Sequence, residues 1–192
     1  MAIDPDWQAD VARWRLGHVP WREQSMWALW VYRLGRRADA RSTGAARSLL
    51  LLVYKLLNTP VKTLTGISIQ KETLIGPGLQ IWHFGNVVVH PRTVISSNCT
   101  LRQGVSLGER HAGGPCPVLE DDVELGSHAH VLGGVRLGRG CRIGAMAVVL
   151  CDVPPGYTAV GNPARVLPPE SADGSRGRAD PDPDSATCLA DE

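Results

Sequence analysis

The sequence predicts a mainly β protein, in which a parallel β-helix follows a small cap of α-helices. Aliphatic residues recur every six positions from Val89 to Val149, and a strict period of six fits neither a single helix nor a single strand. Such a period is typical of a short unit that is repeated and stacked along an axis. The segment 1–62, in contrast, has apolar residues at helical spacing and contains five of the six tryptophans.

Residues 1–62 are expected to form an N-terminal α-helical domain of three helices. The first begins near residue 4, and the second has an apolar face over residues 27–34. The third covers residues 45–57, and the sequence Asn58-Thr59-Pro60 is expected to end it. We interpret the tryptophans as contacts between helices and with a neighbouring subunit. An aromatic ligand-binding box is the alternative.

The repeat is expected to place two residues of each six inside the β-helix. One is the aliphatic residue of the period, and the other, two positions earlier, is small or β-branched. Gly113 interrupts the aliphatic series once, and the series extends backwards to Ile69 with a register shift of two residues. The inward positions are expected at Val89, Ile95, Leu101, Leu107, Leu119, Leu125, Val131, Leu137, Ile143 and Val149, and at Cys99, Val105, Val123, Ala129, Val135, Cys141 and Ala147.

Interruptions of the repeat define the other boundaries. The β-helix is expected to cover residues 63–153, with an extruded loop at 109–117, where the sequence ERHAGGPCP is polar and rich in glycine. Loops that interrupt a regular scaffold often carry function. Residues 154–168 contain too many prolines for another coil and are expected to form a closing strap. Residues 169–192 are polar and of low complexity, so we expect a disordered tail.

The overall charge and the cysteines limit the class of protein. A net charge of +1 gives no reason to expect nucleic acid or a membrane as a partner. The five cysteines form no CxxC pair, so neither a disulfide framework nor a zinc site is indicated. The N-terminus is acidic and has no apolar run, and the apolar run at 49–54 is too short to span a bilayer. We therefore expect a cytoplasmic protein.

The repeat, the sequence WHFG, the extruded loop and the ending VPPGYTAVGNPAR together resemble the left-handed β-helix acyltransferases of the serine acetyltransferase type. The resemblance covers roughly residues 65–167. It implies a left-handed β-helix of hexapeptide repeats, acetyl-CoA as a co-substrate, and a homotrimer or a dimer of trimers. Burial of one side of the β-helix in such an assembly would also cover its strand edges and flat faces.

Two residues are candidates for acyl transfer from a thioester to a hydroxyl. An alcohol is a poor nucleophile at neutral pH and needs a base, for which histidine has the best placed pKa. His83 lies two residues after inward Ile81, near a corner of the coil, and the resemblance places the catalytic histidine there. Gly108, at the corner before the loop, is the candidate for a backbone N–H that faces the oxyanion. An ordinary glycine of the repeat is the alternative.

The other histidines point to weaker hypotheses. His111 lies in the extruded loop and is a candidate for contact with the substrate. His128 and His130 form an HxH pair, but no thiol or carboxylate stands at ligand spacing, so no metal site is predicted. His90 precedes a proline at the register shift, and we expect it to be structural.

The resemblance also implies a carrier site. In the family, acetyl-CoA lies in the groove between adjacent β-helices, along the late coils and the closing strap. Small residues would let the pantetheine arm approach the backbone, and arginines would meet its phosphates. The matching positions are Gly126, Ser127, Arg142, Gly144, Ala145, Asn162, Pro163 and Arg165.

The acceptor-binding positions depart from the family pattern. The aspartate that orients the catalytic histidine is matched by Ser68, and a second aspartate, which helps to hold the amino group of serine, is matched by Trp82. A substrate-binding histidine of the loop is matched by Cys116, and Arg110 is a candidate substitute for the arginine beside it. Asp10 is the candidate for an acceptor-binding aspartate near the N-terminus.

These changes remove most of the acids that would bind the ammonium group of serine. We predict an acetyl-CoA-dependent O-acetyltransferase of the serine acetyltransferase type, which transfers the acyl group directly to a small-molecule hydroxyl with His83 as general base. The acceptor would be L-serine or a related biosynthetic intermediate. The alternatives are a sugar or polysaccharide O- or N-acetyltransferase and a non-catalytic β-helix scaffold.

Overall fold

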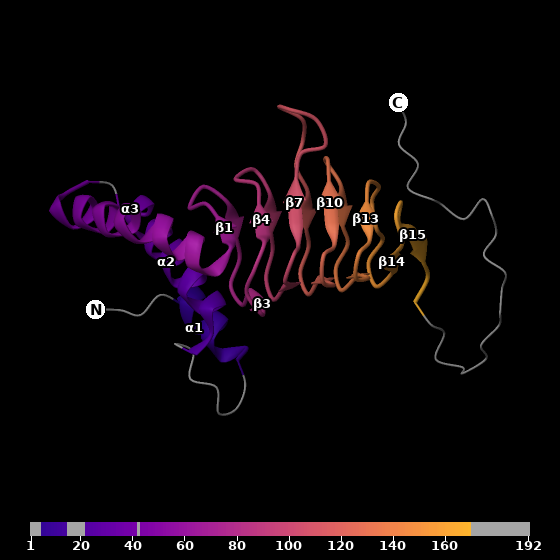
Figure 1. Cartoon of the computed structure of the whole chain (residues 1–192), viewed down its shortest axis with the longest axis horizontal. Coiled ribbons are helices and arrows are strands. Elements are labelled where there is room, and N and C mark those ends of the chain that lie inside the picture. Colours follow the sequence, from indigo (N-terminus) through magenta and orange to yellow (C-terminus); the bar gives the residue numbers. More distant parts are fainter. Residues whose placement is uncertain (1–4, 15–21, 42, 170–192) are drawn as a thin grey trace.

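A computed structural model describes residues 5–14, 22–41 and 43–169, and shows helices at one end of a long β-solenoid (Figure 1). The helices are α1 (Pro5–Ala12), α2 (Gln24–Asp39) and α3 (Ala45–Thr65). The coils of the solenoid stack along the long axis of the molecule. The predicted disordered tail lies, apart from residue 169, outside the described residues.

The solenoid is a left-handed parallel β-helix with three sheets as its faces, which confirms the predicted fold class. All neighbouring strands pair in parallel except β14 and β15, which are antiparallel and close the last coil. Sheet A contains β1 (Ile67–Ile69), β4 (Val87–Val89), β7 (Ser106–Gly108), β10 (His130–Leu132) and β13 (Val148–Val149). Sheet B contains β2 (Leu74–Ile75), β5 (Val94–Ile95), β8 (Val118–Leu119) and β11 (Arg136–Leu137). Sheet C contains β3 (Gln80–Trp82), β6 (Thr100–Arg102), β9 (Glu124–Leu125), β12 (Arg142–Ile143), β14 (Thr158–Val160) and β15 (Arg165–Leu167).

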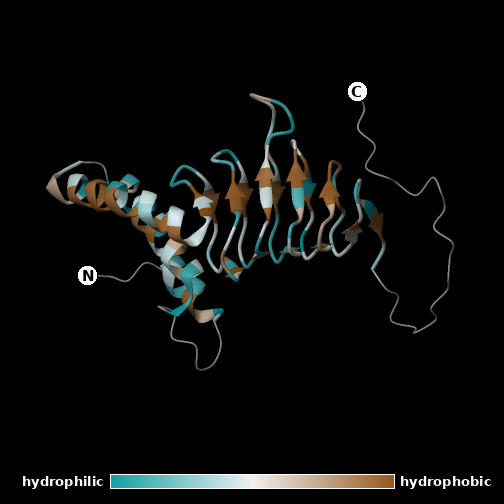
Figure 2. Ribbon diagram, in the orientation of Figure 1, coloured by the Kyte–Doolittle hydropathy of each residue, from teal (hydrophilic) through white to brown (hydrophobic). Residues whose placement is uncertain are grey.

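The inward positions predicted from the period of six are confirmed. Each aliphatic residue at these positions, from Ile69 to Val149, is at most 7% exposed, and the small residues from Cys99 to Ala147 are at most 4% exposed. Hydrophobic segments therefore recur in successive coils, with hydrophilic segments between them (Figure 2). Gly113 is exposed because it belongs to the loop and occupies no inward position.

Two corners of the solenoid are enlarged relative to a coil of eighteen residues. Val89 pairs with Leu107, eighteen residues later, whereas Ile81 pairs with Leu101, twenty residues later. The two extra residues lie between β3 and β4, in the segment that contains His83, and they account for the register shift in the sequence. Leu107 pairs with Val131, twenty-four residues later, because the extruded loop adds six residues between β7 and β8.

Helix α3 continues through Pro60 to Thr65, so the predicted end before this proline is wrong. Proline cannot donate to the carbonyl of Leu56, but Leu56 is 65% exposed and this side of the helix faces solvent. Val61 packs against the core, and the next turn is therefore kept. Gly66, with φ of 66°, ends the helix, and its N–H donates to the carbonyl of Lys62.

The helices pack on one another and on the first coil. Met26 and Leu29 of α2 are fully buried in the main core, and Tyr54 of α3 packs with Val31 and Leu34 of α2. Of the helices that the structure describes, none is both long and apolar enough to cross a membrane.

Candidate active site

His83 lies at the enlarged corner between β3 of sheet C and β4 of sheet A. Its side chain is exposed and its backbone is left-handed, with φ of 64°, a conformation that histidine tolerates better than most residues. Its neighbours Trp82 and Phe84 are 38% and 50% exposed. No described residue forms a hydrogen bond or ion pair with the imidazole of His83, so its nitrogens are open to a ligand.

The corner of His83 continues as one edge of the solenoid. Gly104 donates to the carbonyl of Gly85, and His128 donates to the carbonyl of Gln103, with N···O distances of 3.0 and 2.9 Å. In the next coil, Met146 donates to the carbonyl of Ser127 at 2.9 Å. The predicted carrier residues Ser127 and Ala145 therefore lie on the same edge as His83, two and three coils further along.

The loop lies at a different corner, between sheets A and B. Gly108 ends β7, and residues 109–117 follow it before β8 begins. The width of sheet A therefore separates His83 from Gly108 and from the loop residues Arg110, His111 and Cys116. Within one chain, the structure does not bring the predicted base and the predicted oxyanion donor together.

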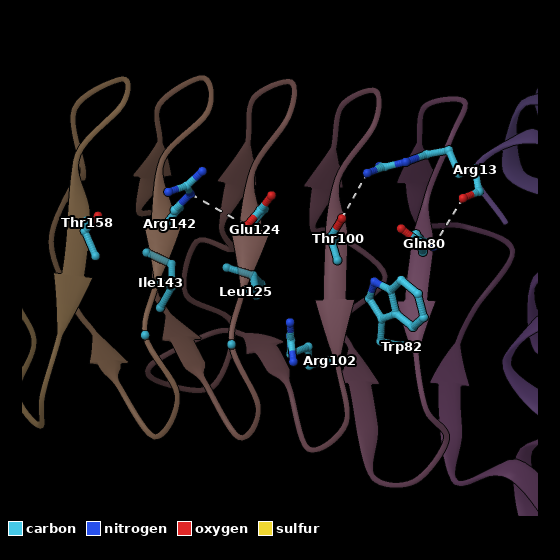
Figure 3. Close-up of a pocket in the computed structure, with 12 residues that line it drawn as sticks. Arg13, Gln80, Trp82, Thr100, Arg102, Glu124, Leu125, Arg142, Ile143 and Thr158 are labelled. Carbon is cyan, nitrogen blue, oxygen red and sulfur yellow. Dashed lines mark hydrogen bonds and ion pairs between the residues drawn. The ribbon is translucent and has the colours of Figure 1, made fainter. Parts of the chain in front are cut away.

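A groove of about 310 Å³ crosses the outer face of sheet C, between Trp82 and the late coils (Figure 3). Three of the predicted carrier residues, Gly126, Arg142 and Gly144, line it. Arg142 also lies 3.7 Å from the carboxylate of Glu124. Of the other predicted carrier residues, Asn162 and Pro163 are exposed in the turn after β14, and Arg165 is exposed at the start of β15.

The groove has further polar walls that the sequence did not indicate. Arg13 donates from its guanidinium to the carbonyl of Gly78 at 2.9 Å and to the hydroxyl of Thr100 at 3.1 Å. Trp14 packs on Trp82, with ring centroids 5.1 Å apart. Arg13, Gln80, Thr100 and Arg102 line the groove. They are far apart in the sequence, and only the stacking of coils shows that they share a face.

Asp10 does not have the acceptor-binding role that the sequence suggested. Its side chain is fully buried, and its two oxygens accept from the Nε and Nη2 of Arg33 and from the backbone N–H of Leu79, at 2.9, 3.1 and 2.9 Å. Arg33 also donates to the carbonyl of Ile75 at 2.9 Å. Asp10 therefore ties α1 to α2 and to the first coil, and it presents no oxygen to a ligand.

Ser68 and Gly108 line one cavity of about 280 Å³ on the outer face of sheet A, together with Val88, Ser106, His90 and Glu109. Arg110 and His111 are exposed and line a different cavity, of about 430 Å³, beneath the loop. The predicted acceptor residues Ser68, Arg110 and His111 are therefore divided between two cavities, and Trp82 lies at the other edge of sheet A, next to His83.

Cys116 is buried at the end of the loop, with its Sγ 3.1 Å from the Nδ1 of His90. The Nε2 of His90 lies 3.9 Å from a carboxylate oxygen of Glu109. Sequence reasoning missed this cluster, because its members are nineteen and seven residues apart and match no local motif. His90, expected to be structural, is its centre.

The thiols inside the solenoid are poor nucleophiles. Burial raises the pKa of Cys99 to about 11 and the pKa of Cys141 to about 12. Burial also raises the pKa of Cys116 above its ordinary value, although Arg92 opposes the shift. Cys151 is disulfide-bonded. The sequence, which has no CxxC pair, gave no indication of a disulfide.

The comparisons with known proteins agree with this architecture. Residues 116–151 match the family "Bacterial transferase hexapeptide (six repeats)". A serine acetyltransferase from Helicobacter pylori is 36% identical over 142 residues, which are 73% of this chain and 79% of the relative. Serine acetyltransferases from Synechococcus elongatus, Bacillus licheniformis and Escherichia coli are longer, and the chain spans 49%, 62% and 46% of their lengths.

Solved structures show the same fold. Soybean serine acetyltransferase complexed with serine is 30% identical, with a TM-score of 0.72, and the match covers 85% of this chain and 70% of that one. Serine acetyltransferase from Brucella abortus strain S19 in complex with coenzyme A is 25% identical, with a TM-score of 0.70, and the match covers 86% and 66%. Because the Helicobacter pylori relative is 36% identical and 79% of its length is matched, the chain belongs to the serine acetyltransferase family.

Proposed function

We propose that this protein is an O-acetyltransferase that moves the acetyl group of acetyl-CoA directly to a hydroxyl, with His83 as the general base. The observation that carries the proposal is the exposed imidazole of His83, unengaged by described residues, on the edge that also bears Ser127 and Ala145. The family membership supports an acyl-transfer reaction. Burial of Cys99 and Cys141 argues against a covalent acyl-enzyme on these thiols.

In the proposed reaction, His83 accepts the hydroxyl proton as the acceptor oxygen attacks the thioester carbonyl. The C–S bond then breaks, and the coenzyme leaves as a thiolate that takes up the proton held by the imidazolium of His83. A backbone N–H is needed to stabilise the oxyanion that develops on the carbonyl. Gly108 remains our candidate for this donor.

Because sheet A separates His83 from Gly108 in one chain, we propose that the site forms between subunits of a homotrimer. The edge of one β-helix would then face the loop corner of the next, and His83 would meet Gly108 and His111 of the partner subunit. The same arrangement would create a groove between β-helices for acetyl-CoA. The Brucella relative bound to coenzyme A supports this ligand for the fold.

For the acceptor, L-serine is the first candidate, because the soybean relative was solved with serine. A second candidate is a neutral hydroxyl compound such as a sugar. Trp82 and Phe84 expose aromatic surface on both sides of His83, and no carboxylate lies next to it in the chain to bind an ammonium group. Aromatic side chains offer a flat apolar surface with little conformational entropy to lose.

The test is the rate of coenzyme A release from acetyl-CoA with serine and with a panel of sugars. His83→Ala should lower kcat/KM by about 100-fold or more with the preferred acceptor, as expected for the loss of a general base. The matched control is His128→Ala, because His128 lies on the same edge two coils further along. Turnover of the His83 variant within a few-fold of the wild type would reject the assignment.

A non-catalytic scaffold would fail a simpler test. Saturating acetyl-CoA should raise the melting temperature of a protein with a true carrier site, because the ligand binds the folded state alone. Replacement of Ser127 or Ala145 by a bulky residue should remove this shift. The absence of any shift in the wild-type protein would favour the scaffold.

A further inference from the structure

Three side chains with the chemistry of metal ligands converge at the base of the extruded loop. The Sγ of Cys116, a ring nitrogen of His90 and a carboxylate oxygen of Glu109 all lie within 4.8 Å of one another. We propose that these residues form a binding site for a transition-metal ion of the Zn²⁺ type, which fixes both ends of the loop to the solenoid. This proposal replaces the prediction, made from the sequence, that the chain has no metal site.

The stacking of the coils brings the three residues together. His90 follows β4 and Glu109 follows shortly after β7, and these two strands are neighbours in sheet A, with Val89 opposite Leu107. Cys116 comes two residues before β8, at the other end of the loop. One ion would therefore connect the preceding coil with the first and the last part of the loop.

The set of donors selects the class of ion. A thiolate, an imidazole and a carboxylate suit Zn²⁺ and Co²⁺, whereas Mg²⁺ and Ca²⁺ prefer oxygen ligands. In a tetrahedral zinc site the ligand atoms lie roughly 3.3–3.7 Å apart, given metal–ligand bonds of about 2.0–2.3 Å. The Sγ–Nδ1 distance of 3.1 Å is close to this range. All three ligand atoms lie within 4.8 Å of one another, so the set needs to contract by about 1 Å to reach this range.

The guanidinium of Arg92 is a cation that lies beside the proposed metal ion, so its contacts must be compatible with metal binding. Its Nη2 is 2.6 Å from the Oε2 of Glu109, and the same atom donates to the carbonyl of Gly114 at 2.8 Å. The N–H of Gly113 also donates to Oε2, at 3.1 Å. All contacts of the Glu109 carboxylate to described residues use Oε2, which leaves Oε1 uncommitted. Arg92 then acts from outside to orient the ligand.

The imidazole of His90 is also held in a suitable state. Its Nδ1 accepts from the backbone N–H of Arg92 at 3.2 Å, so this nitrogen carries a lone pair and no proton. The bond is at the long end of the normal range, and a metal would replace a weak interaction. Nε2 would then carry the proton, 3.9 Å from the Oε2 of Glu109.

The proposed site is accessible. The side chains of His90 and Glu109 are each 28% exposed, and both residues line the cavity on sheet A that also contains Ser68 and Gly108. Three protein ligands leave a fourth position, which water from this cavity would fill. Cys116 has no other side-chain hydrogen bond among the described residues, so the metal would give its buried thiol a strong partner. Binding requires loss of the thiol proton, and affinity should therefore rise with pH.

The experiment is a titration of the full chain, without an affinity tag and after treatment with a chelator and a phosphine reductant, with Co²⁺. We expect one Co²⁺ per chain and a thiolate-to-cobalt charge-transfer band in the near ultraviolet, which Zn²⁺ abolishes by competition. Cys116→Ser should remove the band. His90→Ala and Glu109→Gln should each weaken binding by about 10-fold or more.

Controls separate this site from the other thiols and histidines. Cys141→Ala, Cys151→Ser and His128→Ala should keep the band and its stoichiometry, and circular dichroism without metal should be unchanged in Cys116→Ser. A wild-type protein without the band, or a band that survives Cys116→Ser, would overturn the proposal. Neither result bears on acetyl transfer, because the readout is spectroscopic and requires no turnover.

Discussion

Asp10 and Arg33 form a buried ion pair that joins α1 to α2 and to the first coil, with Nε and Oδ2 2.9 Å apart and the two side chains 0% and 4% exposed. Breaking such a pair leaves an uncompensated charge inside the protein. Asp10→Ala should therefore lower the free energy of unfolding by about 3–5 kcal/mol, and Arg33→Met by a similar amount.

Chemical denaturation followed by circular dichroism measures this effect. Asp6→Ala is the matched control, because its contact with Arg33 is longer, at 3.3 Å, and its side chain is 44% exposed. We expect a change of less than about 1 kcal/mol for the control. An Asp10→Ala protein as stable as the wild type would show that the helices do not depend on this pair.

Substitution of Gly126 and of Gly108 by alanine should have different effects on stability. A Cβ on Gly126 would lie 2.5 Å from the backbone nitrogen of Ala145, whereas a Cβ on Gly108 would meet nothing within 4 Å. Gly126→Ala should force two coils apart and cost about 1–3 kcal/mol. Gly108→Ala should change stability by less than about 1 kcal/mol.

Thermal unfolding distinguishes the two variants, with an expected loss of about 2–4 °C per kcal/mol for a chain of this size. Equal melting temperatures would mean that the coils yield more easily than their spacing suggests. The Gly108 variant keeps its backbone N–H, so its folded protein is also suitable for kinetic measurements.

Most of the architecture could be predicted from the sequence, because the period of six places an aliphatic residue at the same inward position in every coil. Leu101, Leu125 and Ile143 face inward for the same reason, and one error could not shift the others. The end of α3 was missed because local proline chemistry was outweighed by the packing of Val61. Neither the groove of Arg13 and Trp82 nor the cluster around His90 has a sequence signature, since each depends on contacts between coils.

The buried thiols Cys99 and Cys141 should not react with alkylating reagents in the folded protein. Their pKa values of about 11 and about 12 leave almost no thiolate at pH 8. Iodoacetamide at this pH should therefore label neither residue until the chain unfolds, and peptide mass spectrometry provides the measurement. Rapid labelling of either thiol in native protein would contradict the assigned burial.

The same shifts predict how stability depends on pH. A thiol whose pKa is raised in the folded state holds its proton more tightly there than in the unfolded chain. Its contribution to stability is therefore complete below the ordinary pKa of 9.0 and is lost as pH rises towards about 12. Cys141→Ala should reduce this alkaline loss, which denaturant titrations at pH 8 and pH 10.5 would detect.

Trp82 should control the choice of acceptor. Trp82→Asp introduces a carboxylate next to His83 and should raise kcat/KM for serine relative to sugars by about 10-fold or more, since hydrogen bonds to charged groups contribute about 1.5–3 kcal/mol. Trp82→Phe keeps the aromatic surface and should preserve the wild-type preference. An unchanged ratio in the aspartate variant would show that Trp82 does not contact the acceptor.

A site shared between subunits makes a prediction that a site within one chain does not. His83→Ala and His111→Ala proteins should each have low activity alone, because each lacks one half of every site. Trimers assembled from an equal mixture of the two chains should regain up to about a quarter of the wild-type sites, since a quarter of adjacent pairs combine both intact residues. Co-expression with two different tags isolates the mixed trimers. If their activity is only the average of the two parent variants, His83 and His111 do not belong to a common site between subunits.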